Sequence, residues 1–317
     1  LKKDVSQIIE FKTTGWSDRS YPNSLLGVIA VIRQTFLDAD WYHKSIQIIE
    51  KYPDQNEPIS FHPSLSELAD FRLNRKPILF MTKEEHGALR SLRIAEEFNL
   101  SPWLLGSGYE YRRLGEIAEL NPFIIFPLEF PAKPKVKDPF IALQYSTEQL
   151  KHWDMAPDNI NKVFEKGIRF SFTSATLKNK KDFRKNIQKI VDRGLPKSVA
   201  LSALTTYPAE AIGVEKIMGK IQPGYIANLV ITDGDYFNTK SRVTSLWMNG
   251  EEYFVANRHK TIVKGNWELN ISGKVFDLSF KPSQTKKKTK LEKSPQQGKE
   301  KLTGTINDKE LSVSISE

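Results

Sequence analysis

Histidines are the side chains of this chain best suited to hold a metal ion or to transfer a proton near neutral pH. There are five, and the nearest two, His43 and His62, lie 19 positions apart. The sequence therefore contains neither a His-x-His pair nor two histidines on one turn of a helix. It also contains no cysteine, which excludes disulfides, thiolate ligands and thiolate nucleophiles. No compact metal-binding or nucleophile motif is visible in the residues alone.

Three other positions are candidates for lining a pocket. His62 precedes Pro63 in an expected loop, whereas Glu110 and Glu129 each follow an apolar run of strand length. No partner residue is evident for any of them, and a structural role is the simpler interpretation of His62. The GSG segment at 106–108 indicates a tight turn that can approach a phosphate. It lacks the third glycine and the acidic partner of a dinucleotide-binding fingerprint.

The elements that must position these residues alternate between apolar runs and amphipathic stretches. Apolar residues recurring at three and four positions predict one long helix or two over residues 23–52, ended by Pro53. Further along, each of four strand-length apolar runs precedes a helical stretch. These runs are KPILFMT, SPWLLGSG, NPFIIFPLEF and IRFSFTS. The alternation predicts parallel βα units, which fit half of a (β/α)8 barrel or a small doubly wound sheet. Trp41, Trp103 and Trp153 are expected to pack within it.

The later part of the chain changes to a period of two. From about Ile221, apolar and polar residues alternate around Asn-Gly, Ser-Gly and Asn-Asp turns, which is typical of antiparallel strands. We expect residues 1–220 to form a partial (β/α) barrel and residues 221–257 to add β-sandwich strands that close this fold. Residues 258–317 are predicted to form a β-rich module that carries a lysine-rich loop at 281–301.

The formal net charge of +9 is concentrated in that loop, where eight lysines stand against two glutamates. The loop is poor in apolar residues, so a solvated linker is expected. Because no aromatic residues interleave the lysines, we do not expect a nucleic-acid partner. No apolar run approaches the ~18 residues that a membrane span requires. A cysteine-free chain with an appended β-module slightly favours a periplasmic or secreted location.

One segment, LTTYPAEAIGVEKIMGKIQPGYIANLVITDGD at 204–235, resembles the stretch that closes the barrel of the amidohydrolase superfamily. Its glycines and prolines stand where that family has turns. The residues that match are Thr206, Pro208, Ala209, Gly213, Gly219, Ile221, Gly224, Ala227 and Leu229. The segment departs from the family pattern at Tyr207, and at Asn228 where the family usually has Asp. From about Gly15 to Val255 the chain resembles large amidohydrolase-like proteins of bacteria.

The resemblance implies a (β/α)8 barrel beside a β-sandwich, in which zinc or another divalent metal activates water against amide, cyclic amide or peptide-like C–N bonds. Metal ligands in this family stand at the carboxyl ends of barrel strands. Two of those places fall on Met81 and Ala175. A thioether is a poor ligand for a hard divalent ion, and a methyl group is none. We therefore expect a degenerate active site, with no metal and no other cofactor in this segment.

The resemblance also implies a longer polypeptide. Only four barrel strands are evident after Leu1, and the residues before Gly15 are too few to hold the others. The expected partners are thus an N-terminal barrel half and, in a tandem protein, a second amidohydrolase domain. Three interpretations stay open: a hydrolase segment with a decayed half-site, a non-catalytic barrel for binding or scaffolding, and hydrolysis at a shifted mononuclear site. The third would use His62, Glu110 or Glu129.

Overall fold

The computed structural model describes residues 5–14, 20–55 and 57–255, together with the backbone of five strands between 265 and 316. The chain divides into two compact units. The first comprises Leu1–Ala227 and Asp235–Lys240, and the second comprises Asn228–Gly234 and Ser241–Glu317. In the part of the chain that is described, no helix is both long and apolar enough to cross a bilayer.

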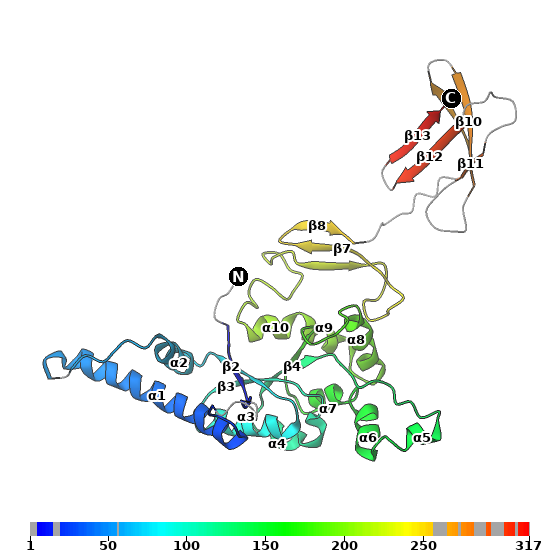
Figure 1. Ribbon diagram of the computed structural model, residues 1–317. Helices are drawn as coiled ribbons and strands as arrows, with labels where there is room; N and C mark the ends of the chain where they lie inside the picture. The colour runs from blue at the N-terminus through cyan, green and yellow to red at the C-terminus, as the bar shows by residue number, and fades with distance from the viewer. Residues whose placement is uncertain are drawn as a thin grey trace. The chain divides into compact units, whose positions relative to one another are not determined.

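The first unit is built on a parallel sheet of five strands whose spatial order follows the chain (Figure 1). The strands are β1 (Gln7–Glu10), β2 (Pro77–Met81), β3 (Ser101–Leu105), β4 (Phe123–Pro127) and β5 (Phe170–Thr173). The inner strands bury Phe80, Leu104 and Phe126 almost completely. Strands covered by helices on both faces need near-continuous apolar runs, which is how these four runs were recognised. Their predicted arrangement side by side is confirmed.

The prediction of four strands was one too few. β1 pairs in parallel with β2, so that Gln7 lies opposite Ile78 and Glu10 lies opposite Met81. This strand has only four residues, is polar at both ends, and leaves Ile8 58% exposed. A strand at the edge of a sheet is covered less completely than an inner one, so no long apolar run marks it in the sequence. The residues before Gly15, which we expected to be too few to hold the other barrel strands, hold one strand, β1.

The long amphipathic stretch forms a single helix of 27 residues, α1 (Leu25–Lys51). Ser24 caps its first turn, because the Ser24 hydroxyl accepts a hydrogen bond from the backbone N–H of Gly27. Pro53 follows its end, as predicted. The other helical segments described in this unit are η1 (Pro53–Gln55), α2 (Pro63–Leu73), α3 (Glu85–Glu97), η2 (Glu110–Arg112), α4 (Leu114–Glu119), α5 (Pro139–Ala142), α6 (Thr147–Met155), α7 (Asn159–Glu165), α8 (Asp182–Asp192), α9 (Lys197–Leu204) and α10 (Thr206–Ala211).

One face of α1 carries exposed apolar side chains. Trp103 is buried in β3, but Trp41 is 60% exposed, and the prediction that it packs within the barrel was wrong. Leu26, Leu37 and Ile48 are also more than half exposed. Their spacing places them on the same side of the helix as Trp41. The 3.6-residue period marks an apolar face, but it does not tell whether that face is covered.

The second unit contains an antiparallel sheet formed by β6 (Leu229–Thr232), β7 (Val243–Met248) and β8 (Glu251–Phe254). Asn249 and Gly250 join β7 to β8 and both have positive φ, at 52° and 88°, which suits an Asn-Gly hairpin turn. The period-two interpretation of this region is therefore confirmed. Five further antiparallel strands are β9 (Gly265–Ile271), β10 (Lys274–Lys281), β11 (Lys290–Glu292), β12 (Lys301–Asn307) and β13 (Glu310–Ser316). Most of the lysine-rich loop lies outside the described residues.

Candidate functional site

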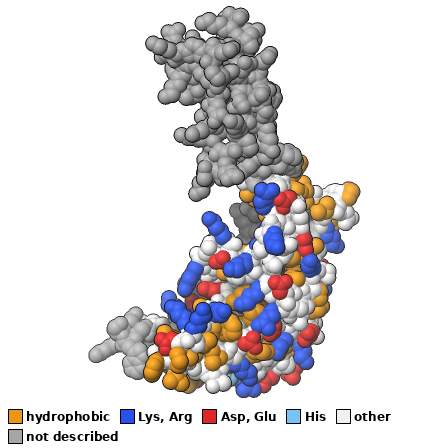
Figure 2. Space-filling model, turned by 90° about the vertical axis from the view of Figure 1, so that its right-hand side faces the viewer, with side chains coloured by type: hydrophobic (Ala, Val, Ile, Leu, Met, Phe, Trp, Pro, Cys, Tyr) orange, Lys and Arg blue, Asp and Glu red, His pale blue; other side chains and the backbone are white. Residues whose placement is uncertain are grey.

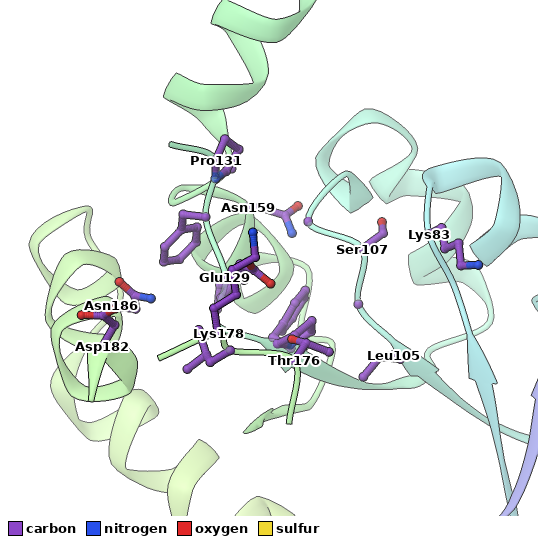
Figure 3. A pocket seen from close by; sticks show the side chains of 18 of the residues that line it. Lys83, Leu105, Ser107, Glu129, Pro131, Asn159, Thr176, Lys178, Asp182 and Asn186 are labelled. Carbon is purple, nitrogen blue, oxygen red and sulfur yellow. The ribbon is translucent and has the colours of Figure 1, made fainter. Parts of the chain in front are cut away.

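A pocket of about 1120 Å³ opens at the carboxyl ends of the parallel strands (Figure 3). The strand ends supply an apolar lining that includes Met81, Leu105 and Phe126. The loops that follow the strands and the helices α6, α7 and α8 supply most of its polar lining. Figure 3 shows Glu129 and Lys178 between α8 and the loop after β3. Ligands of parallel βα barrels are held at this edge, because the loops open there.

The turn after β3 is organised around the side chain of Glu110. One carboxylate oxygen accepts hydrogen bonds from the backbone N–H of Ser107 at 2.5 Å and from its hydroxyl at 3.0 Å. The other oxygen accepts from the backbone N–H of Gly108 at 3.1 Å and from the side-chain amide of Asn159 at 2.6 Å. Glu110 is only 1% exposed. The four donors replace the water that a buried carboxylate must give up.

This network changes the interpretation of two sequence candidates. Glu110 is not among the residues that line the pocket, so the structure does not support it as a pocket residue. Its carboxylate occupies the concave side of the GSG turn, where the N–H groups of Ser107 and Gly108 would otherwise be free for a phosphate. The turn itself needs small residues. A Cβ on Gly106 would lie 2.5 Å from a ring carbon of Phe126, and Gly108 has a φ of +84°.

His152 on α6 lies between this turn and the pocket, which it lines. Its ring stacks on Tyr109 with the two centroids 3.7 Å apart, and its Nδ1 lies 3.4 Å from the hydroxyl of Tyr111. The guanidinium of Arg112 lies over the same Tyr109 ring, 4.6 Å from its centroid. Burial lowers the pKa of His152, and the charge of Arg112 acts in the same direction. In the sequence, only an amphipathic helix pattern surrounds His152, so no local signal distinguishes it as a pocket residue.

Three lysines line the pocket and are called the lysine wall below: Lys178 in the loop before α8, and Lys185 and Lys189 on α8 itself. In the described part of the chain, none of the three has a carboxylate oxygen within 4.0 Å of its ammonium group. The ammonium of Lys189 lies 4.8 Å from the ring centroid of Phe130. Burial lowers the pKa of Lys189, and the charges of Arg193 and Lys185 lower it further. Figure 2 shows a face of the molecule on which Lys and Arg side chains are distributed among hydrophobic ones.

The other residues selected from the sequence lie in different places. Met81 and Glu129 line the pocket, and Glu129 is exposed there. Ala175 follows β5 but does not line the pocket, although Thr176 does. His62 directly precedes α2, where its ring contacts Tyr42 edge-on with centroids 6.0 Å apart, and it does not line the pocket either. The structure therefore brings Met81 and Glu129 together at the pocket, without His62 or Glu110.

The donor groups at the pocket do not fit a divalent metal ion. Within the ranges that the structure describes, no three His, Cys, Asp or Glu side chains gather closely enough to hold one. Glu10 at the end of β1 forms an ion pair with Lys83, their charged atoms 3.2 Å apart. The end of β2 presents the thioether of Met81, a soft ligand unsuited to zinc or magnesium in an oxygen- and nitrogen-rich site.

Comparisons with known proteins agree with this architecture. The model of a family described as "Amidohydrolase family" matches residues 155–267. Amidohydrolase tasK of Hapsidospora irregularis is 34% identical over 61 residues, which are 19% of this chain and 6% of that protein. The crystal structure of an amidohydrolase from Thermotoga maritima MSB8 matches with a TM-score of 0.64 and 21% identity, over 80% of this chain and 63% of that one. The family match over residues 155–267 and the curated relative support membership of the amidohydrolase superfamily.

The parallel order of the five strands and the likeness to the Thermotoga structure make the sheet part of a TIM-like barrel, as predicted. The likeness to the Thermotoga structure is a likeness of fold. This chain spans 63% of the length of that protein, and the matched segment spans 6% of the curated relative. Amidohydrolases are generally metal-dependent, whereas the donor groups described above do not fit a metal.

Proposed function

We propose that this chain is part of an amidohydrolase-type hydrolase acting on C–N bonds of amides, cyclic amides or peptide-like compounds. We further propose that its own strand ends contact the substrate without a metal ion. Two observations support this. Part of the chain matches a family of hydrolases, and its pocket lies at the edge of the sheet where barrel enzymes bind their substrates.

The observation that carries the proposal is the chemistry at the ends of β2 and β5. In the resemblance to the family, these ends correspond to metal-ligand positions, and they hold Met81 and Ala175. Met81 lines the pocket with a thioether, and the backbone N–H of Ala175 donates to the hydroxyl of Thr173 at 3.1 Å. Neither side chain can hold a hard cation or take a proton from water.

In this proposal the chain binds and orients the substrate. Its strand ends exclude water from the apolar part of the ligand, and its loops offer charged and polar groups to the rest. The family's metal chemistry, which activates water, is supplied by other parts of a longer polypeptide. The limited coverage of the Thermotoga amidohydrolase and of the curated relative is compatible with that arrangement.

The runner-up is a non-catalytic barrel that binds or scaffolds other molecules, favoured by the same lack of suitable donor groups among the described residues. Assays on the natural full-length polypeptide distinguish the two functions. Hydrolysis of amide or cyclic amide substrates that stops when a chelator is added supports the hydrolase. Ligand binding without any turnover supports the scaffold.

Metal analysis of the purified 317-residue chain tests the loss of the metal site. We expect far less than one equivalent of zinc or manganese after dialysis against either ion, measured by elemental analysis on protein without a histidine tag. A stoichiometric ion would contradict the proposal. Variants His62→Ala, Glu110→Gln and Glu129→Gln would then show which carboxylate or imidazole holds it.

A further inference from the structure

We infer that the pocket binds an organic carboxylate, with the anionic end held at the lysine wall and the apolar body on Met81, Leu105 and Phe126. This rests on the proposed function in one respect, because it takes the strand-end pocket as the substrate site. It names the class of substrate, which the family resemblance leaves open. Three features of the pocket lead to this inference. Among the described residues, the lysine wall has no carboxylate partners, helix α8 is fixed in place, and two backbone N–H groups of the GSG turn are already bound by Glu110.

The charge on the lysine wall is not balanced by its neighbours. Lys185 and Lys189 are four positions apart on α8, a spacing at which like charges destabilise a helix. Asp182 and Glu129 also line the pocket, yet neither forms an ion pair with the lysine wall in the described residues. A bound anion would remove this repulsion. Three ammonium groups without carboxylate partners around a hollow are therefore typical of a site for an anion.

The helix that carries two of these lysines is held on both sides. The side-chain amide of Asn186 donates to the carbonyl oxygen of Leu128 at 2.6 Å, which fixes α8 to the loop after β4. On the other side, Nε of Arg184 donates to the carbonyl oxygen of Tyr236 at 2.6 Å. Gln188 accepts a hydrogen bond from the backbone N–H of Thr239 at 3.0 Å. These contacts fix the backbone of α8 that carries the two lysines, so binding need not order the helix itself.

The filled turn after β3 argues for a carboxylate over a phosphate ester. Phosphates are commonly bound by successive backbone N–H groups, and those of Ser107 and Gly108, which line the pocket, already donate to Glu110. The remaining unpaired cations are lysine ammonium groups, which act as point charges and can each hold a carboxylate. Glu129 and Asp182 would oppose a ligand of higher negative charge. The volume of about 1120 Å³ leaves room for a sizeable apolar body.

The test compares three probes with the same apolar tail: octanoate, 1-octanol and octylammonium, titrated calorimetrically into the full chain at low salt. We expect octanoate to bind about tenfold or more tightly than either other probe, because only its carboxylate forms hydrogen bonds with lysine in which both partners are charged. Its affinity should fall as salt is raised. Equal binding of all three probes, or no binding of octanoate, would overturn the inference.

Variants assign the effect to the lysine wall. The double variant Lys185→Gln/Lys189→Gln should lose about tenfold in octanoate affinity and nothing in octanol affinity. Lys181→Gln is the matched control, since Lys181 precedes the same helix, is exposed, and does not line the pocket. An equal loss in this control would overturn the inference. The metal analysis gives an independent result. If the chain holds no metal and octanoate does not bind selectively, this inference fails and the proposed function stands. If the chain holds a metal and octanoate does bind selectively, the proposed function fails and this inference stands.

Discussion

Two charged regions border the same hollow and differ in how their charges are satisfied. The Glu110 network is closed, since each carboxylate oxygen accepts two hydrogen bonds and the side chain is 1% exposed. The lysine wall differs, since its three lysines line the pocket and none has a carboxylate oxygen within 4.0 Å of its ammonium group in the described residues. Both regions lie in loops or helices at the carboxyl edge of one sheet.

The difference separates architecture from ligand binding. Burying a charge is tolerated only when hydrogen bonds replace its water, so a fully satisfied buried carboxylate stabilises the fold and is not free to contact a ligand. A charge left without a partner beside a cavity contributes little to the fold and remains free to bind. Removing a group from the first region should therefore lower stability, and removing one from the second should lower affinity.

The largest effect is expected for Glu110→Ala, which should reduce the free energy of unfolding by about 3 kcal/mol. The substitution leaves the part-buried N–H groups of Ser107 and Gly108 and the buried amide of Asn159 without their acceptor. Urea unfolding measures the change. Glu116→Ala is the control, because Glu116 is an exposed partner of Arg113, and its loss should cost less than about 0.5 kcal/mol. Equal stability of the two variants would contradict the structural role of Glu110.

Gly106→Ala should destabilise the fold by about 2 kcal/mol, because overpacking a closed region forces its neighbours to move. The added methyl would lie 2.5 Å from a ring carbon of Phe126, which is 2% exposed and has no room to retreat. Gly115→Ala has no atom within 4 Å of its new Cβ and lies in α4. It should leave stability unchanged or raise it by up to about 1 kcal/mol. Thermal unfolding of both variants distinguishes these outcomes.

A smaller effect is expected from pH, through His152, which lies between the two regions. Its pKa is lowered in the folded protein, mainly by burial, from an ordinary value of 6.5. The unfolded chain therefore binds a proton more readily, and stability should fall as pH drops from about 6.5 toward the lower folded pKa. Urea midpoints between pH 8 and pH 5 should show this loss, and His152→Gln should remove part of it. An unchanged slope in the variant would contradict the prediction.

The smallest effect on stability belongs to Lys185→Gln/Lys189→Gln. Removing two like charges spaced four apart should leave the fold unchanged or raise its stability by about 0.2–0.5 kcal/mol. The same variant should lose octanoate affinity, so that stability and binding move independently. Urea unfolding in the absence of ligand measures the first quantity. A large loss of stability would show that the lysine wall is part of the architecture, and the contrast with Glu110 would then fail.

The amino-acid sequence was sufficient for elements whose signal is local. The apolar runs of β2 to β5, the helix α1 and the Asn249–Gly250 hairpin each carry their own pattern, and the structure has all of them. The position of Met81 at the end of a strand could also be predicted from the apolar run that it ends. The short edge strand β1 and the exposure of Trp41 were missed, because coverage by neighbouring elements leaves no mark in a residue's own surroundings.

The sequence by itself determined that this chain alternates buried strands with helices, and which side chains end those strands. Only the tertiary structure decided which charges are satisfied. Glu110 is closed off by an amide 49 positions away on Asn159, and the helix of Lys185 and Lys189 is fixed by contacts with Leu128 and Tyr236. Periodicity is set by neighbours along the chain, whereas the solvation and pairing of a charge are set by whatever the fold brings within a few ångströms of it.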